Sequence, residues 1–367
     1  MKILTLGTLF CLIVLWSNSL NGQSVWTQHN DQDRTGWYPH ETILDTSNVN
    51  QNAFGLQFSH TLDDKIMVQP LVVLNVNIPN KGIKNVVYVA TLSNTVYAFD
   101  ADANTGPYWQ QNYTNSITPG GPACTTCRPA NNNDIFPSLC DGYYGDFFGN
   151  MGIIGTPVID TTSGTMYFVS KVVNGTVDNH PWNPATPYEE YTYLSGGFHQ
   201  YLHAIDITTG LDRPNSPVEI TASVTGTGDG QTSPNIITFN PRTQFNRTGL
   251  ALNNGILYIA FAAHCDNNPS HGWVISYNAS NLAFQKAMIV TPNDGRGGIW
   301  MSGTAPAIDP GGNLYFATGN SLDETPGTSN TGIIHLYTPD PTVTANRGES
   351  VVKLASDLTI SSYFTPY

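Results

Sequence analysis

The sequence contains four copies of one short pattern of strands and turns, and this repeat limits the folds that the chain can adopt. The clearest copy, NVVYVATLSNTVYAFDADANTG (Asn85–Gly106), reads as two alternating strands joined by a polar turn and ended by Thr-Gly. The other copies are GTMYFVSKVV with YLHAIDITTG, GILYIAFAAH with GWVISYNASNL, and GNLYFATGN with ESVVKLASDL. Each copy carries a tyrosine at the same place in its second strand: Tyr88, Tyr167, Tyr258 and Tyr315.

Each copy is flanked by two further strands. An apolar strand marked by Gly or Pro precedes it, and a more polar strand follows it, as in YWQQNYT and FQKAMIV. Four antiparallel strands that repeat are typical of a β-propeller blade, because a lone sheet cannot cover both of its faces and must stack on its neighbours. The sequence predicts an all-β fold, a β-propeller with four blades, and a β-sandwich is the weaker alternative. The strands expected nearest the axis are Gln69–Val73, Gly155–Asp160, Gly249–Leu252 and Gly303–Ile308.

The spacing of the blades is uneven, which predicts long insertions at Asn115–Asn150 and Asn174–His199. Such insertions emerge at the loop ends of blades, where they either form a binding face or only brace the structure. The segment Phe54–Asp64 resembles an outer strand that has no blade of its own. We therefore expect an incomplete ring, in which the blades that would accept this strand are missing.

Composition restricts the partners. The 367 residues are 40% hydrophobic and 11% charged, with a net charge of −13 and no run of Lys or Arg, so neither a nucleic acid nor an anionic membrane is expected to bind. Residues 1–23 combine one Lys, an apolar run too short to span a bilayer and small polar residues, as a secretory signal does. We expect residues 24–367 to form a single exported propeller domain, secreted to the extracellular space or the periplasm, without a membrane span and monomeric.

The units resemble the pyrroloquinoline quinone (PQQ) repeat of the quinoprotein alcohol dehydrogenase-like propellers. That repeat reads h-Y-h-x-T-x-x-G-x-h-Y-A-h-D-A-x-T-G-x-x-h-W, and VYVATLSNTVYAFDADANTGPYW (Val87–Trp109) follows it nearly throughout. The N-terminal segment of this sequence is also similar to the N-terminal segment of the family. The matching residues are Trp26, Arg34, Thr35, Asn48, Val49, Phe54 and Leu56. The resemblance implies the fold strongly, whereas the same blade serves dehydrogenases, sugar-linked enzymes and outer-membrane assembly factors.

The resemblance also implies PQQ and calcium as cofactors. In the dehydrogenases of the family, adjacent cysteines and a Trp hold the quinone, Glu, Asn and Asp bind the calcium ion, and an Asp is the base. This sequence has no adjacent cysteines, and no calcium triad can be assigned from it. The turn DADANTG (Asp100–Gly106) lacks the glycine and glutamate positions of a calcium loop, so we expect no metal site there.

One candidate ligand site lies in DGRGGIWMSG, which leads into the first strand of the fourth blade. Arg296 would attract an anionic ligand in the central funnel, and Trp300 would supply a flat wall, with Gln69 facing both from the first blade. The alternatives are structural: Arg296 pairs with Asp294 or Asp266, and Trp300 fills the space between blades.

A second candidate is AHCDNNPSHGW, which gathers His264, Cys265, Asp266 and His271 between two strands of the third blade. Histidine and aspartate suit metal binding or acid–base chemistry. The spacing of the two histidines matches no zinc motif, and a hairpin loop stapled by Cys265 is the alternative.

Four cysteines remain after the signal segment, and an exported protein favours disulfides over the redox or zinc roles that the C-x-x-C pair Cys124–Cys127 also allows. The disulfide candidates are Cys124, Cys127, Cys140 and Cys265, and their pairing is open. Four N-x-S/T sequons are glycosylation candidates in a host that glycosylates: Asn112, Asn174, Asn246 and Asn278.

Two functions remain open at this stage. The first is a binding or scaffold propeller that holds a protein or a glycan, and the second is a quinoprotein-like oxidoreductase acting on alcohols or sugars. The missing cysteine pair and the unassigned calcium ligands favour the first, and no catalytic residue is assigned.

Overall fold

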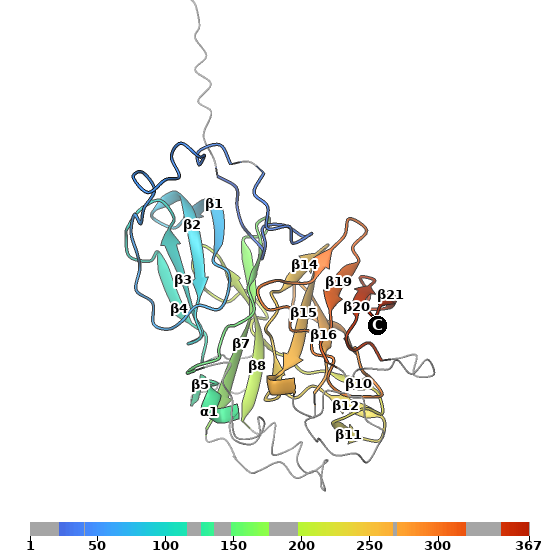
Figure 1. Cartoon of the computed structure of the whole chain (residues 1–367). Helices are drawn as coiled ribbons and strands as arrows, with labels where there is room; N and C mark the ends of the chain where they lie inside the picture. The colour runs from blue at the N-terminus through green and yellow to red at the C-terminus, as the bar shows by residue number, and fades with distance from the viewer. Residues whose placement is uncertain are drawn as a thin grey trace, which may run out of the picture.

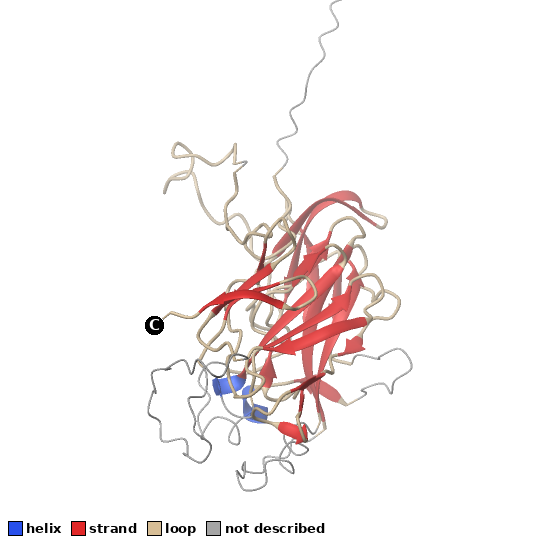
Figure 2. Cartoon of the chain, turned by 90° about the vertical axis from the view of Figure 1, so that its right-hand side faces the viewer, coloured by secondary structure: helices blue, strands red, loops and turns tan. Residues whose placement is uncertain are grey.

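The protein consists almost entirely of strands and loops (Figure 2). The computed structural model describes residues 22–39, 41–115, 126–135, 148–175, 197–266, 270–320 and 346–366. Within these ranges, helix is limited to α1 (Asn132–Ile135) and the 3-10 turn η1 (His264–Asp266). The same ranges contain no helix with the length and apolar character needed to cross a membrane.

Four antiparallel sheets follow one another along the chain, as the repeat predicts (Figure 1). The first sheet has the order β1 (Leu71–Ile78), β2 (Gly82–Ala90), β3 (Thr95–Asp100) and β4 (Trp109–Asn112). The second contains β6 (Val158–Asp160), β7 (Thr165–Asn174), β8 (Phe198–Asp206) and β9 (Val218–Glu219), with β5 (Cys127–Pro129) beside β7.

The third and fourth sheets repeat this order. The third contains β14 (Ala251–Asn253), β15 (Ile256–Ala263), β16 (Trp273–Asn278) and β17 (Phe284–Ile289), with β13 (Gln244–Phe245) beside β15. The fourth contains β18 (Ala307–Ile308), β19 (Leu314–Ala317), β20 (Val351–Leu354) and β21 (Ile360–Phe364). Because β14 contacts both β6 and β18, the first strands of these three sheets converge, as the propeller prediction requires.

A small fifth sheet was not predicted. It is formed by β10 (Ser223–Thr225), β11 (Gln231–Ser233) and β12 (Ile236–Thr238), which lie between the second and third repeats in the sequence. Its strand β10 contacts β17, so this sheet packs at the outer edge of the third sheet.

The repeated tyrosines connect each sheet to the next. The hydroxyl groups of Tyr88, Tyr167 and Tyr258 donate to the main-chain carbonyls of Ile207, Ala279 and Ser356, each over 3.0 Å. Each acceptor lies in the turn that ends the third strand of the following sheet, and the three tyrosine side chains are at most 3% exposed. The phenol therefore buries its ring between two sheets and satisfies a carbonyl that the turn leaves unpaired.

A tryptophan reinforces the first of these contacts. Trp109 donates from its indole nitrogen to the carbonyl of Ile207 over 2.9 Å, the same carbonyl that accepts from Tyr88. Its ring lies against Gly210, where an added Cβ would come within 2.5 Å of the indole. Glycine suits this position through its φ of +73° and leaves the space that the tryptophan fills, whereas the equivalent residue of the third sheet is Leu282, with a φ of 56°.

The N-terminal segment 23–34 crosses the first strands of all four sheets. Val25 pairs with Val72 in the first sheet, and the carbonyl of Trp26 accepts from the Ile159 amide of the second over 2.8 Å. Gln32 donates to the carbonyl of Leu252 in the third sheet over 2.6 Å. The fourth sheet is joined through the amide of Ile308 to the Gln32 carbonyl, over 2.9 Å, and through Arg34 to Pro306.

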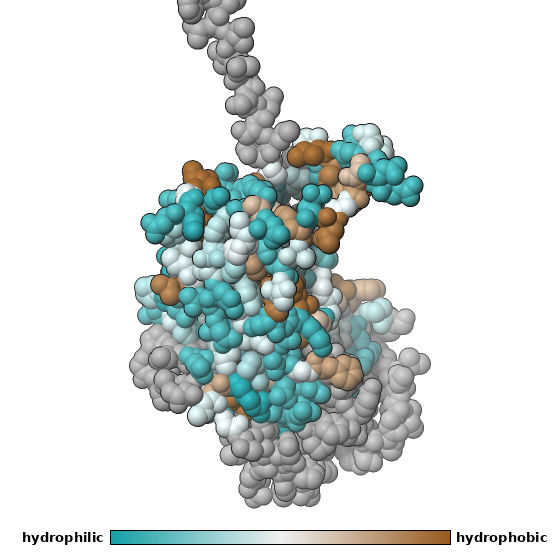
Figure 3. Space-filling model, turned by 90° about the vertical axis from the view of Figure 1, so that its left-hand side faces the viewer, coloured by the Kyte–Doolittle hydropathy of each residue, from teal (hydrophilic) through white to brown (hydrophobic). Residues whose placement is uncertain are grey.

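The prediction of an outer strand at Phe54–Asp64 is wrong, because these residues form no strand. The segment is held by side chains instead: the ring of His60 stacks on Phe99 at 4.2 Å, and Asp63 accepts from Thr91 over 2.8 Å. Leu56 is 86% exposed, and Figure 3 shows such hydrophobic side chains as separate spots on a largely hydrophilic face. In the part of the chain that the structure describes, no strand edge pairs with Phe54–Asp64, and a strand needs such a partner for its main-chain hydrogen bonds.

The ring is open within the described residues. The first and fourth sheets lie on opposite sides of the molecule (Figure 1), and no strand of one pairs with a strand of the other in the described ranges. This agrees with the expectation that these four blades alone do not form a sealed ring.

Replacing Gly210 with Ala tests the tryptophan contact. Both Gly210 and Gly255 have a φ near +74°, and a Cβ at Gly255 would meet open space. Each Ala variant therefore carries the same backbone strain of about 1–2 kcal/mol. Gly210→Ala adds a clash with Trp109, worth about 1–3 kcal/mol. Urea unfolding should show the Gly210 variant less stable than the Gly255 variant by that amount, and equal stabilities would contradict the contact.

Candidate functional site

The structure brings Trp300 and Asp266 together. The indole nitrogen of Trp300 donates to Asp266 over 2.9 Å, and the amide of Asn320 reaches the other oxygen of the same carboxylate at 3.3 Å. The indole ring meets Phe245 edge-on, with 6.1 Å between ring centres. Trp300 is therefore held between β13 and η1 by one polar and one aromatic contact, which favours the structural alternative for this residue.

Arg296 and Gln69 do not join this group. Arg296 pairs through its main chain with His271 in a parallel bridge and donates its amide to Ser270 over 2.7 Å. No ion pair of Arg296 with Asp294 or Asp266 occurs in the described residues, and its buried Nε has no hydrogen-bond partner there. Gln69 instead accepts from the His29 amide over 3.0 Å, so its oxygen is held by the N-terminal segment.

The two histidines of the second candidate lie in different environments. His264 is 1% exposed and lies 2.8 Å from the amine of Lys171, which also donates to the carbonyls of Arg242 and Gln244. Burial, together with the positive charges of Lys171 and Arg242, holds the pKa of His264 well below its ordinary value. Burial and the charge of Arg242 likewise lower the pKa of Lys171. The sequence did not reveal the lysine of this buried cluster, whose amine is held by two carbonyls and the imidazole of His264.

The imidazole of His271 has partners other than His264 and Asp266. Its Nε2 lies 2.7 Å from the carbonyl of Asp229, and its Nδ1 lies 3.0 Å from the hydroxyl of Thr291. A carbonyl only accepts, so Nε2 carries the proton. Burial lowers the pKa of His271 to about 4, and the ring is therefore neutral at pH 7. The second candidate is thus not assembled into one metal or acid–base site.

A serine, a histidine and an aspartate meet where the first and second sheets pack together. Ser170 Oγ lies 3.1 Å from His203 Nε2, and His203 Nδ1 lies 3.1 Å from Asp212. This is the order of contacts found in hydrolase triads. However, Ser170 and His203 are 0% exposed, and the imidazole stacks on Phe168 at 4.8 Å. A nucleophile needs access to its substrate, so we interpret this set as a buried polar contact within the second sheet.

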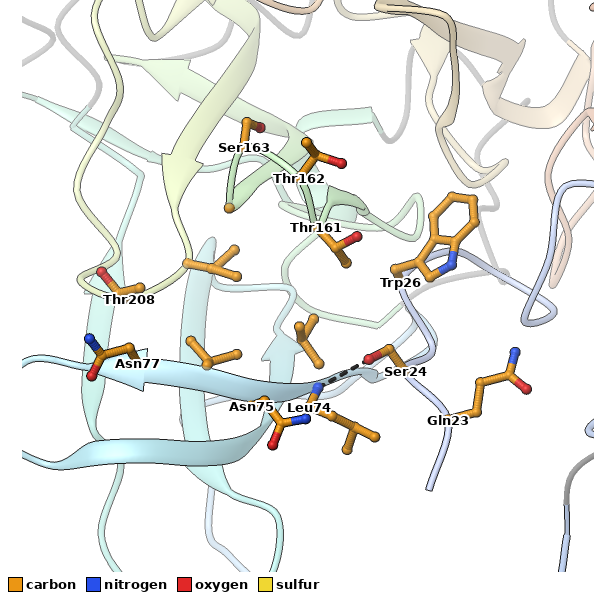
Figure 4. Close-up of a pocket in the computed structure, with 14 residues that line it drawn as sticks. Gln23, Ser24, Trp26, Leu74, Asn75, Asn77, Thr161, Thr162, Ser163 and Thr208 are labelled. Carbon is orange, nitrogen blue, oxygen red and sulfur yellow. Dashed lines mark hydrogen bonds between the residues drawn. The ribbon is translucent and has the colours of Figure 1, made fainter. Parts of the chain in front are cut away.

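A pocket of about 610 Å³ opens at the junction of the first two sheets and the N-terminal segment (Figure 4). One wall is β1 from Val73 to Asn77, and the hairpin 161–164 between β6 and β7 lies opposite. Thr208 lies at one end, and Ser24 and Trp26 lie at the other. Ile207 also lines the pocket.

A β-bulge shapes the β1 wall. The pairing of β1 with β2 shifts between Val73 and Val76, which leaves the main chain of Leu74 and Asn75 without its usual ladder partners. Ser24 accepts the Leu74 amide over 3.1 Å, and the side chain of Asn85 accepts the Asn75 amide over 3.2 Å. The N-terminal segment therefore fixes the bulge as well as closing the pocket.

The cysteine and sequon candidates are placed as follows. Cys127 begins β5 and Cys265 lies in η1, whereas Cys124 and Cys140 lie outside the described residues. Asn246 is 6% exposed and donates its amide to the carbonyls of Thr248 and Ala260, so the folded chain has no room for a glycan there. The exposed sequons are Asn112 and Asn174, and Asn278 is partly exposed.

Neither the pocket of Figure 4 nor the surroundings of Trp300 fit the cofactors that the family resemblance implies. PQQ is a tricarboxylate, which requires cationic or several strong donor groups. No charged side chain lines the pocket of Figure 4, and Trp300 faces the carboxylate of Asp266. Among the described residues, no three His, Cys, Asp or Glu side chains converge on a point where a metal ion would bind. We therefore derive no chemical step through these groups.

The comparisons with known proteins support the fold. No family model matches the chain, and no curated protein matches its sequence. Among solved structures, the quinohemoprotein alcohol dehydrogenase from Comamonas testosteroni is similar over 93% of this chain and 41% of its own, with 13% identity and a TM-score of 0.50. A europium-containing methanol dehydrogenase is similar over 93% of this chain and 48% of its own, with 12% identity and a TM-score of 0.51.

These similarities define a class of protein. The chain is an all-β protein whose sheets are arranged as in the β-propellers of these quinoproteins. It spans less than half the length of either relative, and at such identities the likeness concerns the fold alone.

The buried His271 predicts a dependence of stability on pH. The unfolded chain protonates this histidine near pH 6.5, whereas the folded protein does so only near pH 4. As pH falls from 6.5 toward 4 the unfolded state alone gains a proton, so stability falls, by roughly 3 kcal/mol from this residue.

His271→Gln should flatten the loss of unfolding free energy between these pH values in urea titrations. The partly exposed His199 supplies the comparison, because His199→Gln also removes one histidine, but from a side chain that is 29% exposed. An unaltered slope in the His271 variant would show that this histidine is not held neutral by burial.

Proposed function

We propose that the protein is an exported binding or scaffold propeller rather than a quinoprotein-like oxidoreductase. The observation that supports this best is the placement of the predicted site residues. The indole nitrogen of Trp300 is bonded to Asp266 and the side-chain oxygen of Gln69 to His29, so of the three predicted funnel residues only Arg296, which pairs with His271 through its main chain, keeps its side chain for an anion. A binding role requires only an accessible pocket with fixed walls, and the pocket of Figure 4 is one.

The second candidate function, oxidation of alcohols or sugars with PQQ and calcium, is favoured by the fold that the chain shares with two quinoprotein dehydrogenases. In this case the quinone would need a site other than the pocket of Figure 4 and the surroundings of Trp300. The candidates are therefore separated by whether the protein takes up the quinone.

We also propose that the chain is exported and cross-linked by disulfides. The apolar run in residues 1–23 supports export, although it lies almost wholly outside the described residues. Neither Cys127 nor Cys265 is without a partner, which supports pairing within the set Cys124, Cys127, Cys140 and Cys265. A monomer, with a protein or glycan as ligand, completes this proposal.

Reconstitution with PQQ and calcium tests the proposed function. The purified protein should show no saturable quinone absorbance and no reduction of a dye when an alcohol or an aldose is added. The Trp300→Phe variant is the matched control for quinone uptake, because it keeps an aromatic ring but loses the hydrogen bond to Asp266. Stoichiometric quinone uptake that Trp300→Phe weakens, together with dye reduction, would establish the oxidoreductase instead.

A further inference from the structure

We propose that the pocket between the first two sheets binds a neutral polyhydroxylated ligand, namely a sugar unit up to the size of a disaccharide. This inference rests on the proposed binding function and names the class of its ligand. It follows from the charge, the walls and the available hydrogen-bonding groups of the pocket.

The side chains that line the pocket carry no charge. No Asp, Glu, Lys, Arg or His side chain is among the residues that line this pocket. The nearest acid in the hairpin, Asp160, is turned to its own loop, where it accepts from the Thr162 amide over 2.9 Å and from Ser163 over 2.7 Å. Behind the hairpin, Arg213 donates to the carbonyls of Ser163 and Gly164 over 3.0 and 3.1 Å, and its charge is balanced by Asp206 at 3.2 Å. The lining therefore offers no unpaired side-chain charge, and a neutral ligand is favoured.

The walls combine apolar and polar surface. Val73, Val76 and Ile207 supply apolar side chains, and Trp26 supplies an aromatic ring at one end (Figure 4). A pyranose has the complementary form, because its C–H groups make an apolar face and its hydroxyl groups point outward around the ring. An aromatic ring stacks on the apolar face, while amides and hydroxyl groups bond the edge.

Several polar groups of the lining are available for a ligand. In the described part of the chain, the side chains of Asn77, Thr161 and Thr162 line the pocket and make no hydrogen bond within the protein. An asparagine amide both donates and accepts, and so does a threonine hydroxyl, which matches the two roles of a sugar hydroxyl. These groups lie on opposite walls, Asn77 on β1 and the threonines on the hairpin (Figure 4).

The pocket is also of suitable size and fixed shape. Its volume of about 610 Å³ lies within the range of roughly 300–1,000 Å³ that is typical of small-molecule sites. The bulge in β1 is held by Ser24, and the hairpin by Asp160, so both walls are positioned before a ligand arrives. A preformed site of this kind lowers the entropic cost of binding.

A second groove, between the outer strands of the second and third sheets, provides an internal comparison. Its lining includes Glu219, and Phe284 supplies an exposed aromatic ring there. Because that groove has a carboxylate, it lacks the neutral character that we assign to the sugar pocket.

The test is binding of named sugars to the protein, measured by isothermal titration and by saturation-transfer NMR. The probes are glucose, galactose, mannose and N-acetylglucosamine, with maltose, lactose and chitobiose, and glucuronic acid as the charged analogue. We expect at least one neutral sugar to bind with a Kd on the order of 1 mM or tighter. Glucuronic acid should bind more weakly than glucose. The same sugars coupled to albumin distinguish a glycan ligand from a free sugar.

Substitutions in the two grooves show which of them binds the sugar. Trp26→Ala and Asn77→Ala should each weaken it about tenfold. Phe284→Ala, in the other groove, should leave it unchanged. Absence of binding by every neutral sugar, equal binding of glucuronic acid, or binding that Phe284→Ala weakens and Trp26→Ala spares would overturn the inference. None of these results changes the outcome of the quinone reconstitution, so the two proposals fail separately.

Discussion

The fold depends on one contact made three times, in which a tyrosine of one sheet donates to a turn carbonyl of the next. A four-stranded sheet cannot bury both faces by itself, so it needs a neighbour in a fixed register. Apolar side chains alone would allow the sheets to slide, because burial has no direction. The hydroxyl groups of Tyr88, Tyr167 and Tyr258 remove this freedom, since each reaches a single carbonyl at 3.0 Å.

The N-terminal segment adds a second constraint, and the candidate pocket depends on it. The segment joins β1, β6, β14 and β18 by main-chain and side-chain hydrogen bonds, and at its start Ser24 satisfies the bulge in β1. The pocket exists where this segment, the bulge and the hairpin of the second sheet meet. Its lining is therefore assembled from three distant parts of the sequence, each fixed for a structural reason.

The repeat made most of the fold predictable. The tyrosine of the second strand recurs in all four copies, and the first two copies also end in Thr-Gly, so the strands and their order followed from the sequence. The crossing segment did not, because Gln32 and Leu252 are 220 positions apart and no periodic pattern connects them. Phe54–Asp64 misled for the opposite reason: its local pattern suits a strand, but strand formation also requires a partner edge.

The candidate site was less predictable than the fold. Trp300 and Asp266 were both singled out, yet their hydrogen bond to each other depends on how η1 packs against the fourth sheet. Lys171, which lies 2.8 Å from His264, stands in an apolar strand, and nothing in the sequence around it indicated this contact. The neutral residues of the pocket, such as Asn77 and Thr161, are common in any turn-rich protein, so only their position in space marks them.

The most direct measurement compares two buried tyrosines of the second sheet. Tyr167 donates to Ala279, whereas the hydroxyl of Tyr201, which is 6% exposed, makes no hydrogen bond to the described residues. If the tyrosine contact fixes the register, Tyr167→Phe lowers the free energy of unfolding in urea by about 1 kcal/mol. Tyr201→Phe then changes it by no more than about 0.3 kcal/mol. Equal effects of the two substitutions would contradict the account, because the ring alone would then hold the sheets together.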